Sequence, residues 1–121
     1  MAYNKITVDG KTPNSTVEIF LSPNVTEIAN TQTSNYTISS YTGVEEIFIF
    51  DVGASININL PDASTVGEGY KYQLKNISAY TLTVDPSSNQ YIDHSGQTTY
   101  DLDVQYQNIT LVSDGANWFI I

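Results

Sequence analysis

Apolar and polar residues alternate over residues 55–60, and this stretch is followed by Pro61 and a glycine-bracketed loop. Ile56 and Ile58 would share one side of an extended chain, with serine and asparagine on the other side. This period of two predicts a half-buried β-strand, and proline ends the strand because it has no N–H to donate. The alternation returns over residues 70–76, so we expect two antiparallel strands with one solvent-facing side.

Similar runs, rich in Thr, Val, Ile, Tyr and Phe, fill the chain from residue 36 onward, with Gly, Asn, Asp and Pro between them. No segment shows the capped apolar stripe of period 3.6 that marks a helix. We therefore predict an all-β fold, an antiparallel β-sandwich or roll of short strands with little or no helix. The expected strands cover residues 36–41, 46–51, 55–60, 70–76, 80–84, 90–93, 98–104, 107–113 and 117–121.

The first 35 residues differ from the rest of the chain. Residues 3–8 and 16–21 have the composition of short strands, with a turn at Asp9-Gly10, whereas residues 25–35 are polar and aperiodic. This segment is either an arm that orders against a partner or a hairpin packed on the same domain. We accordingly divide the chain into an N-terminal arm or hairpin, residues 1–35, and a β-rich module, residues 36–121.

The bulk composition narrows the classes of protein. A chain of 121 residues is long enough for one domain. The net charge is −9, with 4 basic residues against 13 acidic ones, and this repels phosphate, so we expect no nucleic-acid partner. No apolar run approaches the roughly 18 residues of a membrane helix. The first ten residues contain no apolar segment, so we expect no signal peptide, and the absence of cysteine fits a reducing compartment.

Two expected strands, residues 47–50 and 118–121, are apolar on both faces. Such a strand requires cover on both sides. In so small a domain, the second cover is either another subunit or a loop or neighbouring sheet of the same chain. The predicted trimer or core contacts are Ile47, Phe48, Ile49, Phe50, Trp118, Phe119, Ile120 and Ile121.

Tyrosine is frequent, with 9 residues against one tryptophan. A tyrosine can bury its ring and keep its hydroxyl in water, which suits sheet rims, interfaces and stacking on sugars. In strands, however, aromatic residues usually form core contacts or cross-strand pairs. The candidate ligand-facing aromatics are Tyr91 and Tyr100.

No catalytic, cofactor-binding or metal-binding residue is predicted. His94 lies in the run Asp-His-Ser-Gly, but catalytic triads are assembled from separate loops, and these four residue types favour turns. Asp101 and Asp103 share one face of an expected strand and most simply form its solvent-facing side. A glycan-degrading enzyme would need two opposed carboxylates in a cleft.

Residues 39–121 resemble the β-rich modules of tailed-phage fibre and head-fibre proteins. The resemblance rests on several motifs in a fixed order, of which the last is the most specific. These motifs are EIFIFDVGASININ at 46–59, LPDAS at 60–64, YKYQLKN at 70–76, TLTVDP at 81–86, QYID at 90–93 and QYQNITLVSDGANWFII at 105–121.

The resemblance implies a non-enzymatic virion component with an antiparallel β fold, usually a homotrimeric knob. Because the module nearly fills the chain, a head-fibre or capsid decoration protein suits it better than a long tail fibre. Residues 1–35 would then anchor the knob on the major capsid protein or another virion protein. The expected location is the capsid surface, after assembly in the host cytoplasm. The alternative is the receptor- or carbohydrate-binding tip of a tail fibre, with a host-surface glycan as its partner in host attachment.

Overall fold

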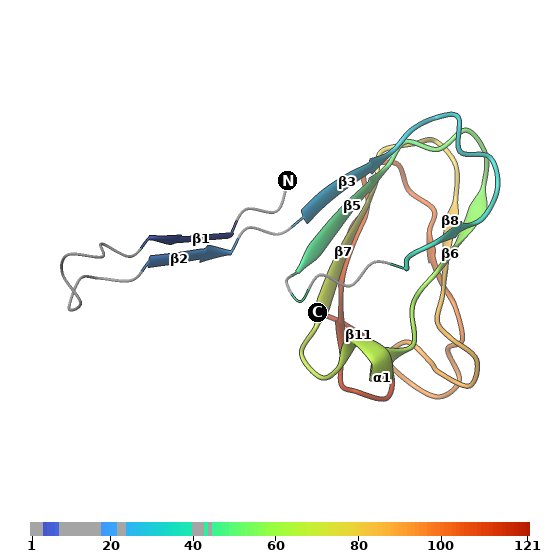
Figure 1. The fold of residues 1–121 in the computed structure, drawn as a ribbon. Helices are drawn as coiled ribbons and strands as arrows, with labels where there is room; N and C mark the ends of the chain where they lie inside the picture. The colour runs from blue at the N-terminus through green and yellow to red at the C-terminus, as the bar shows by residue number, and fades with distance from the viewer. Residues whose placement is uncertain (1–3, 8–17, 22–23, 40–42, 44) are drawn as a thin grey trace.

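The computed structural model describes residues 4–7, 18–21, 24–39, 43 and 45–121. Two β-sheets face each other and form the body of the molecule (Figure 1). Within the described residues the one helix is α1 (Ala63–Val66), a single turn. The prediction of an all-β fold with little or no helix is therefore confirmed. No helix of the described residues is both long and apolar enough to cross a membrane.

The larger sheet has five strands in the order β11-β10-β7-β5-β3, and the smaller has four in the order β4-β6-β8-β9. The larger sheet contains β3 (Asn24–Ile28), β5 (Glu46–Phe50), β7 (Lys71–Asn76), β10 (Asn108–Ser113) and β11 (Trp118–Ile120). The smaller sheet contains β4 (Tyr36–Thr37), β6 (Ile56–Asn59), β8 (Leu82–Asp85) and β9 (Tyr100–Leu102). Of the strands expected from residue 36 onward, only that at 90–93 is absent, and there Ile92 forms an isolated bridge with Trp118.

The chain winds alternately between the two sheets. It passes from β3 to β4, from β5 to β6 and from β7 to β8, so successive turns stack β3, β5 and β7 in parallel in one sheet and β4, β6 and β8 in parallel in the other. After β8 the direction reverses, and β9 and β10 pair antiparallel with β8 and β7. Both sheets are therefore mixed, and the expectation of purely antiparallel sheets is wrong.

The strands β6 and β7, which we expected to pair, lie in different sheets. Their alternation correctly gives the buried side of each strand, but a period of two determines faces and not neighbours. The turn α1 lies between them in the chain, and Asp62 caps it by accepting a hydrogen bond from the Ser64 N–H at 2.9 Å. The connection thus carries the chain across to the opposite sheet.

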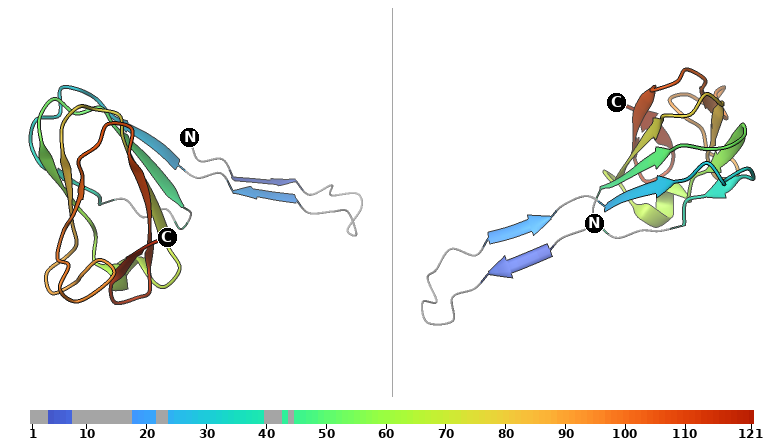
Figure 2. Two further views of the ribbon diagram at one scale, coloured as in Figure 1. Left: turned by 180° about the vertical axis from the view of Figure 1, so that it is seen from behind. Right: turned by 90° about the horizontal axis from the view of Figure 1, so that it is seen from above.

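The strands β1 (Asn4–Thr7) and β2 (Glu18–Leu21) form an antiparallel hairpin that projects away from the body (Figures 1 and 2). They correspond to the two strands expected in the first 21 residues, whereas the turn expected at Asp9-Gly10 lies outside the described residues. The expected domain boundary after residue 35 is wrong, because β3 pairs with β5 and thus belongs to the body. As an edge strand, β3 buries only Ile28 fully, which explains its polar, aperiodic sequence.

The core lies between the two sheets and is closed by aromatic rings. Phe48 and Phe50 stack with their centroids 6.1 Å apart, and Tyr72 lies 5.6 Å from Trp118. Aliphatic side chains of the smaller sheet fill the facing side, all of them fully buried: Ile58, Leu82, Val84 and Leu102. Such close packing makes the body sensitive to truncation of its large side chains.

Asn76 and Gly53 make close contacts between segments that connect the two sheets. The carboxamide of Asn76 is fully buried; it donates to the carbonyls of Tyr80 at 2.8 Å and Leu102 at 3.1 Å, and accepts from the Ser78 N–H and hydroxyl. At another turn, the backbone at Gly53 packs so closely on the Asn30 carbonyl that a Cβ would overlap it. Both residues fix corners where the chain leaves the five-stranded sheet.

Candidate functional site

The predicted trimer or core contacts divide between the two sides of the five-stranded sheet. Three of them lie in the core with 1% exposure or less: Phe48, Phe50 and Trp118. Ile120 is half-buried and packs against the core, whereas Ile121 is 66% exposed. The remaining three are half-buried on the opposite side of the sheet: Ile47, Ile49 and Phe119. Neighbouring side chains of the same sheet therefore give these strands part of their second cover.

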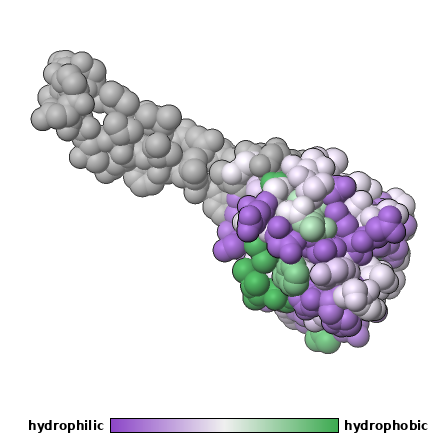
Figure 3. Space-filling model, turned by 90° about the horizontal axis from the view of Figure 1, so that it is seen from below, coloured by the Kyte–Doolittle hydropathy of each residue, from purple (hydrophilic) through white to green (hydrophobic). Residues whose placement is uncertain are grey.

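The outer face of the five-stranded sheet combines apolar residues with lysines. Registers place Val25, Ile47 and Gln73 in one row across the sheet, and Lys71, Val112 and Phe119 in another. Val25 is 46% exposed. Seen from below, the body carries a group of strongly apolar atoms on the flank of this sheet, beside hydrophilic residues (Figure 3). We call this surface the outer face, with members Val25, Glu27, Ile47, Ile49, Lys71, Gln73, Lys75, Thr110, Val112 and Phe119.

The outward side of the four-stranded sheet has a different chemistry. Its rows consist of Thr, Asn and Asp side chains that bond with one another: Thr83 Oγ1 donates to Asp101 Oδ1 at 2.9 Å, and Asn59 Nδ2 donates to Thr37 Oγ1 at 3.3 Å. Asp101 thus lies on the solvent-facing side, as expected for it. The two sheets therefore present a polar, acidic surface on one side and an apolar, lysine-bearing one on the other.

Three of the motifs that carry the fibre-module resemblance meet at one end of the body, near α1. The Gln90 carboxamide donates to Asp62 Oδ1 at 2.7 Å and accepts from the Ala63 N–H at 3.1 Å. The Ser113 hydroxyl donates to the Ala63 carbonyl at 2.9 Å, and the Asn117 carboxamide oxygen accepts from the Tyr91 N–H at 3.1 Å. We call these residues the motif cluster: Asp62, Ala63, Gln90, Tyr91, Ser113 and Asn117.

Hydrogen bonds to carboxylates organise the turns of this cluster. Bonds from the Ser64 hydroxyl, the Ser64 N–H and Gln90 lower the pKa of Asp62. In the last hairpin, the backbone N–H groups of Asn117 and Ala116 donate to Asp114 and hold its pKa below the ordinary value. Asp, Gly and Asn in this turn therefore have structural functions.

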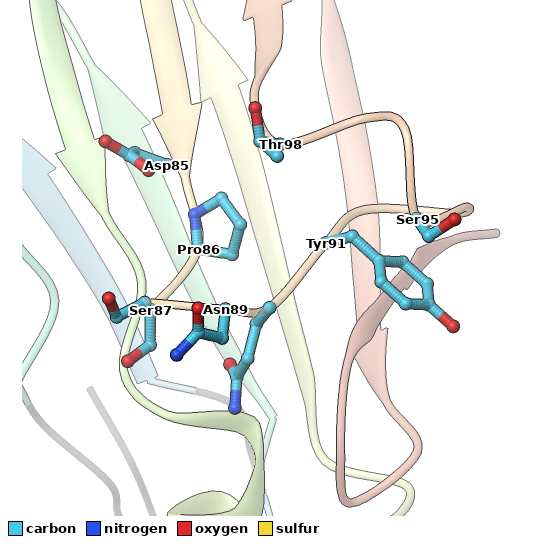
Figure 4. Close-up of a pocket in the computed structure, with 9 residues that line it drawn as sticks. Asp85, Pro86, Ser87, Asn89, Tyr91, Ser95 and Thr98 are labelled. Atoms are coloured by element: carbon cyan, nitrogen blue, oxygen red, sulfur yellow. The ribbon is translucent and has the colours of Figure 1, made fainter.

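A pocket of about 480 Å³ opens beside the motif cluster, between residues 85–91 and the chain near Ser95 and Thr98 (Figure 4). Tyr91, one of the two candidate ligand-facing aromatics, lines it, whereas Tyr100 is half-buried and packs against the core instead. Sequence reasoning missed the lining residues 85–89, because side chains in turns carry no periodic signal. The lining consists of Asp85, Pro86, Ser87, Ser88, Asn89, Gln90, Tyr91, Ser95 and Thr98.

The residues considered for catalysis are exposed and do not converge. His94 lies in a turn, where its Nδ1 accepts from the Gly96 N–H at 3.2 Å. Asp93 accepts from the Ile120 N–H at 2.8 Å, and Asp103 is exposed. Among the described residues, no three His, Cys, Asp or Glu side chains form a group that could hold a metal ion.

One buried carboxylate lies away from the pocket. Glu46 is 2% exposed at the start of β5 and accepts a hydrogen bond from the Tyr70 hydroxyl at 2.6 Å. Burial, and then the Glu46 charge, raise the pKa of Tyr36 above its usual value of 10.0. This network lies on the inner side of the sheet, where it contributes to the core.

Comparisons of the chain with protein-family models, with curated proteins and with solved structures return no significant match.

Proposed function

We propose that this chain is a non-enzymatic structural component of a tailed-phage virion, a capsid decoration or head-fibre protein. The order of motifs that resembles fibre modules carries this proposal. It is supported by the placement of three of those motifs in the motif cluster, where side chains from Asp62 to Asn117 bond with one another. These motifs would then be the parts of the sequence that form one hydrogen-bonded region of the fold.

The proposed assembly is a homotrimer whose subunits meet through the outer face. Ile47, Ile49 and Phe119 lie on the outward side of this sheet and are only half-buried within one chain. Contact between copies would remove these residues from water and complete the cover of the two doubly apolar strands. The trimer would carry three times the −9 charge of one chain, which favours solubility.

The proposed attachment to the capsid uses the N-terminal segment. The β1–β2 hairpin pairs only within itself among the described strands and projects from the body, so it can contact another protein while the two-sheet body stays free (Figure 2). The major capsid protein, or another virion protein, would be its partner, and the body would project outward from the capsid.

The assembly is tested first by light scattering after size exclusion. A trimer gives a mass of about 40 kDa, three times the 13.3 kDa chain. Ile49→Asp places a charge on the outer face and should reduce the mass to that of the monomer. The matched control Asn57→Asp adds the same charge to the outward side of β6 and should leave the trimer intact. A monomeric wild-type chain would argue against self-assembly.

The attachment is tested by co-sedimentation with capsids of the encoding phage that lack this chain. We expect saturable binding by the full chain and loss of binding when residues 1–21 are removed, while the truncated chain keeps its trimeric mass. A full chain that does not bind these capsids would overturn the virion assignment.

A further inference from the structure

We propose that the pocket lined by residues 85–91, Ser95 and Thr98 binds a neutral saccharide. The inference does not depend on the proposed virion function, since it stands on the pocket alone. With a volume of about 480 Å³, the pocket is within the range of sites that hold a small ligand. Four of its lining residues, Ser88, Asn89, Ser95 and Thr98, are exposed, so a ligand can reach the pocket from outside.

The lining indicates a ligand with many hydroxyl groups. Most lining side chains are hydroxyls, amides or a carboxylate, in contrast to the apolar lining of a typical site for a drug-like ligand. Within the described part of the chain, the side chains of Asp85, Ser87, Asn89, Ser95 and Thr98 form no hydrogen bond to another protein group. Their donors and acceptors therefore remain available to a ligand.

The charge of the pocket favours a neutral saccharide over an anionic one. Asp85 is the only carboxylate in the lining, and no lysine lines the pocket. Lys71 and Lys75 lie instead on the outer face of the five-stranded sheet. A phosphate, sulfate or sialic-acid group would approach Asp85 in a protein of net charge −9 without a cation to pair with it. A vicinal diol, in contrast, can donate two hydrogen bonds to this carboxylate.

Tyr91 provides the aromatic surface on which a sugar ring can lie. Its ring is half-buried and contacts Phe119 edge to face, with centroids 6.2 Å apart and an interplanar angle of 86°. This contact restricts the orientation of the ring. An aromatic ring with an apolar body and a polar tip suits the C–H face of a sugar, which also has hydroxyls at its rim.

The walls of the pocket are held in place before any ligand binds. Gln90 bonds through its side chain to Asp62 and Ala63, and its N–H donates to the Ser87 carbonyl at 2.9 Å. The Tyr91 N–H donates to Asn117, and the Trp118 N–H donates to the Tyr91 carbonyl at 3.0 Å. Such preorganisation reduces the entropy lost on binding.

The test begins with an array of neutral and anionic oligosaccharides built from glucose, galactose, mannose, N-acetylglucosamine and sialic acid. The best neutral hit is then titrated into ¹⁵N-labelled full-length protein, up to about 20 mM because a single small site of this kind binds weakly. We expect saturable shifts confined to the amides of residues 85–98 and of the adjoining Asn117.

Two variants and one control locate the site. Tyr91→Ala should weaken binding about tenfold. Asn89→Gly should weaken it about fivefold by removing only an amide, because Asn89 has a φ of 67°, which glycine adopts freely. The control Tyr80→Ala removes a 46% exposed tyrosine outside the pocket and should not change binding.

Each outcome decides the proposal. Saturable binding that both pocket variants weaken supports it, and Asn89→Gly preserves the test if Tyr91→Ala does not fold. The proposal is overturned by the absence of any neutral hit, by preferential binding of sialylated glycans, or by binding that neither variant changes. Failure here leaves the trimer mass and capsid binding untouched, so it is distinguishable from failure of the virion proposal.

Discussion

The carboxamide of Gln90 joins two segments that are 28 residues apart: it donates to Asp62 Oδ1 at 2.7 Å and accepts from the N–H of Ala63. One side chain thereby completes the cap of α1 and fixes the loop that forms a wall of the pocket. The position of the loop consequently depends on the hydrogen bonds of a polar side chain.

Replacement of Gln90 by alanine should decrease stability by about 1 kcal/mol, because the Ala63 N–H loses its acceptor and water replaces it only in part. Gln90→Glu should be worse at pH 7, where its carboxylate faces that of Asp62, and should recover at acidic pH once one of the two carboxyl groups is protonated and the repulsion is removed. Urea unfolding at both pH values measures this. Ser88→Ala, an exposed change in the same loop, is the control. Gln90 variants that are as stable as the wild type at pH 7 would contradict a stabilising function of the Gln90 hydrogen bonds.

Trp118 should be the residue whose truncation costs most. It is fully buried against Tyr72, so Trp118→Ala should decrease the free energy of unfolding by about 3–5 kcal/mol. Its indole N–H is buried and has no hydrogen-bond partner among the described residues. Trp118→Phe removes this unpaired donor along with part of the ring and should cost clearly less. Chemical denaturation of both variants, with Tyr80→Ala as a control at a 46% exposed aromatic residue, tests this order.

The alternation in the sequence correctly gave the buried side of most strands. Ile56, Ile58, Tyr72 and Leu74 all lie in the core, as the period of two requires. The same signal could not give the pairing, because parallel and antiparallel neighbours bury the same alternate residues. The winding between two sheets therefore follows only from the three-dimensional structure.

Edge position explains why the sequence of β3 does not distinguish an arm from a strand of the body. Its outward residues include Val25 and Glu27, and Ile28 is its only fully buried residue, so its sequence resembles that of a loop.

The pocket was only partly predictable from the sequence, because residues that hold it in place act through partners that are distant along the chain. Tyr91 is conspicuous as an aromatic, whereas Gln90 and Asn117 act through partners 27 and 26 residues away in the sequence.

Gly53 should not tolerate a side chain. A Cβ at this position would overlap the Asn30 carbonyl, which belongs to the backbone of the preceding turn and cannot rotate away. We expect Gly53→Ala to destabilise the protein by about 1–3 kcal/mol through this overpacking. Gly96→Ala is the matched control, since its Cβ would meet only the exposed His94 side chain, at 3.3 Å. Thermal unfolding of both variants should show a large shift for the first and a small one for the second.

Acid should weaken the last hairpin through Asp114. Its pKa is lowered in the folded protein by hydrogen bonds from Asn117 and Ala116, so the folded state binds its proton less readily than the unfolded chain. The resulting stability is fully present above the ordinary value of 3.8 and is lost as the pH falls through the lowered pKa. Asp114→Asn should therefore flatten the dependence of stability on pH between about 5 and 2. Unfolding curves for this variant that parallel those of the wild type throughout would contradict the assignment.

The buried side chain of Asn76, at the end of β7, offers the sharpest test of how the chain passes between the two sheets. Both of its amide protons point at carbonyls, those of Tyr80 and Leu102, and the latter belongs to β9. Asn76→Asp keeps the shape but replaces the buried donor with an oxygen, so we expect a loss of about 2–4 kcal/mol at pH 7, because a charge is buried against two acceptors. Protonation gives the carboxyl one donor and should restore part of this stability at low pH. Asn108→Asp, an exposed change at the start of β10, serves as the control, and equal unfolding free energies for the two variants would show that the buried corner does not hold β7, β8 and β9 together.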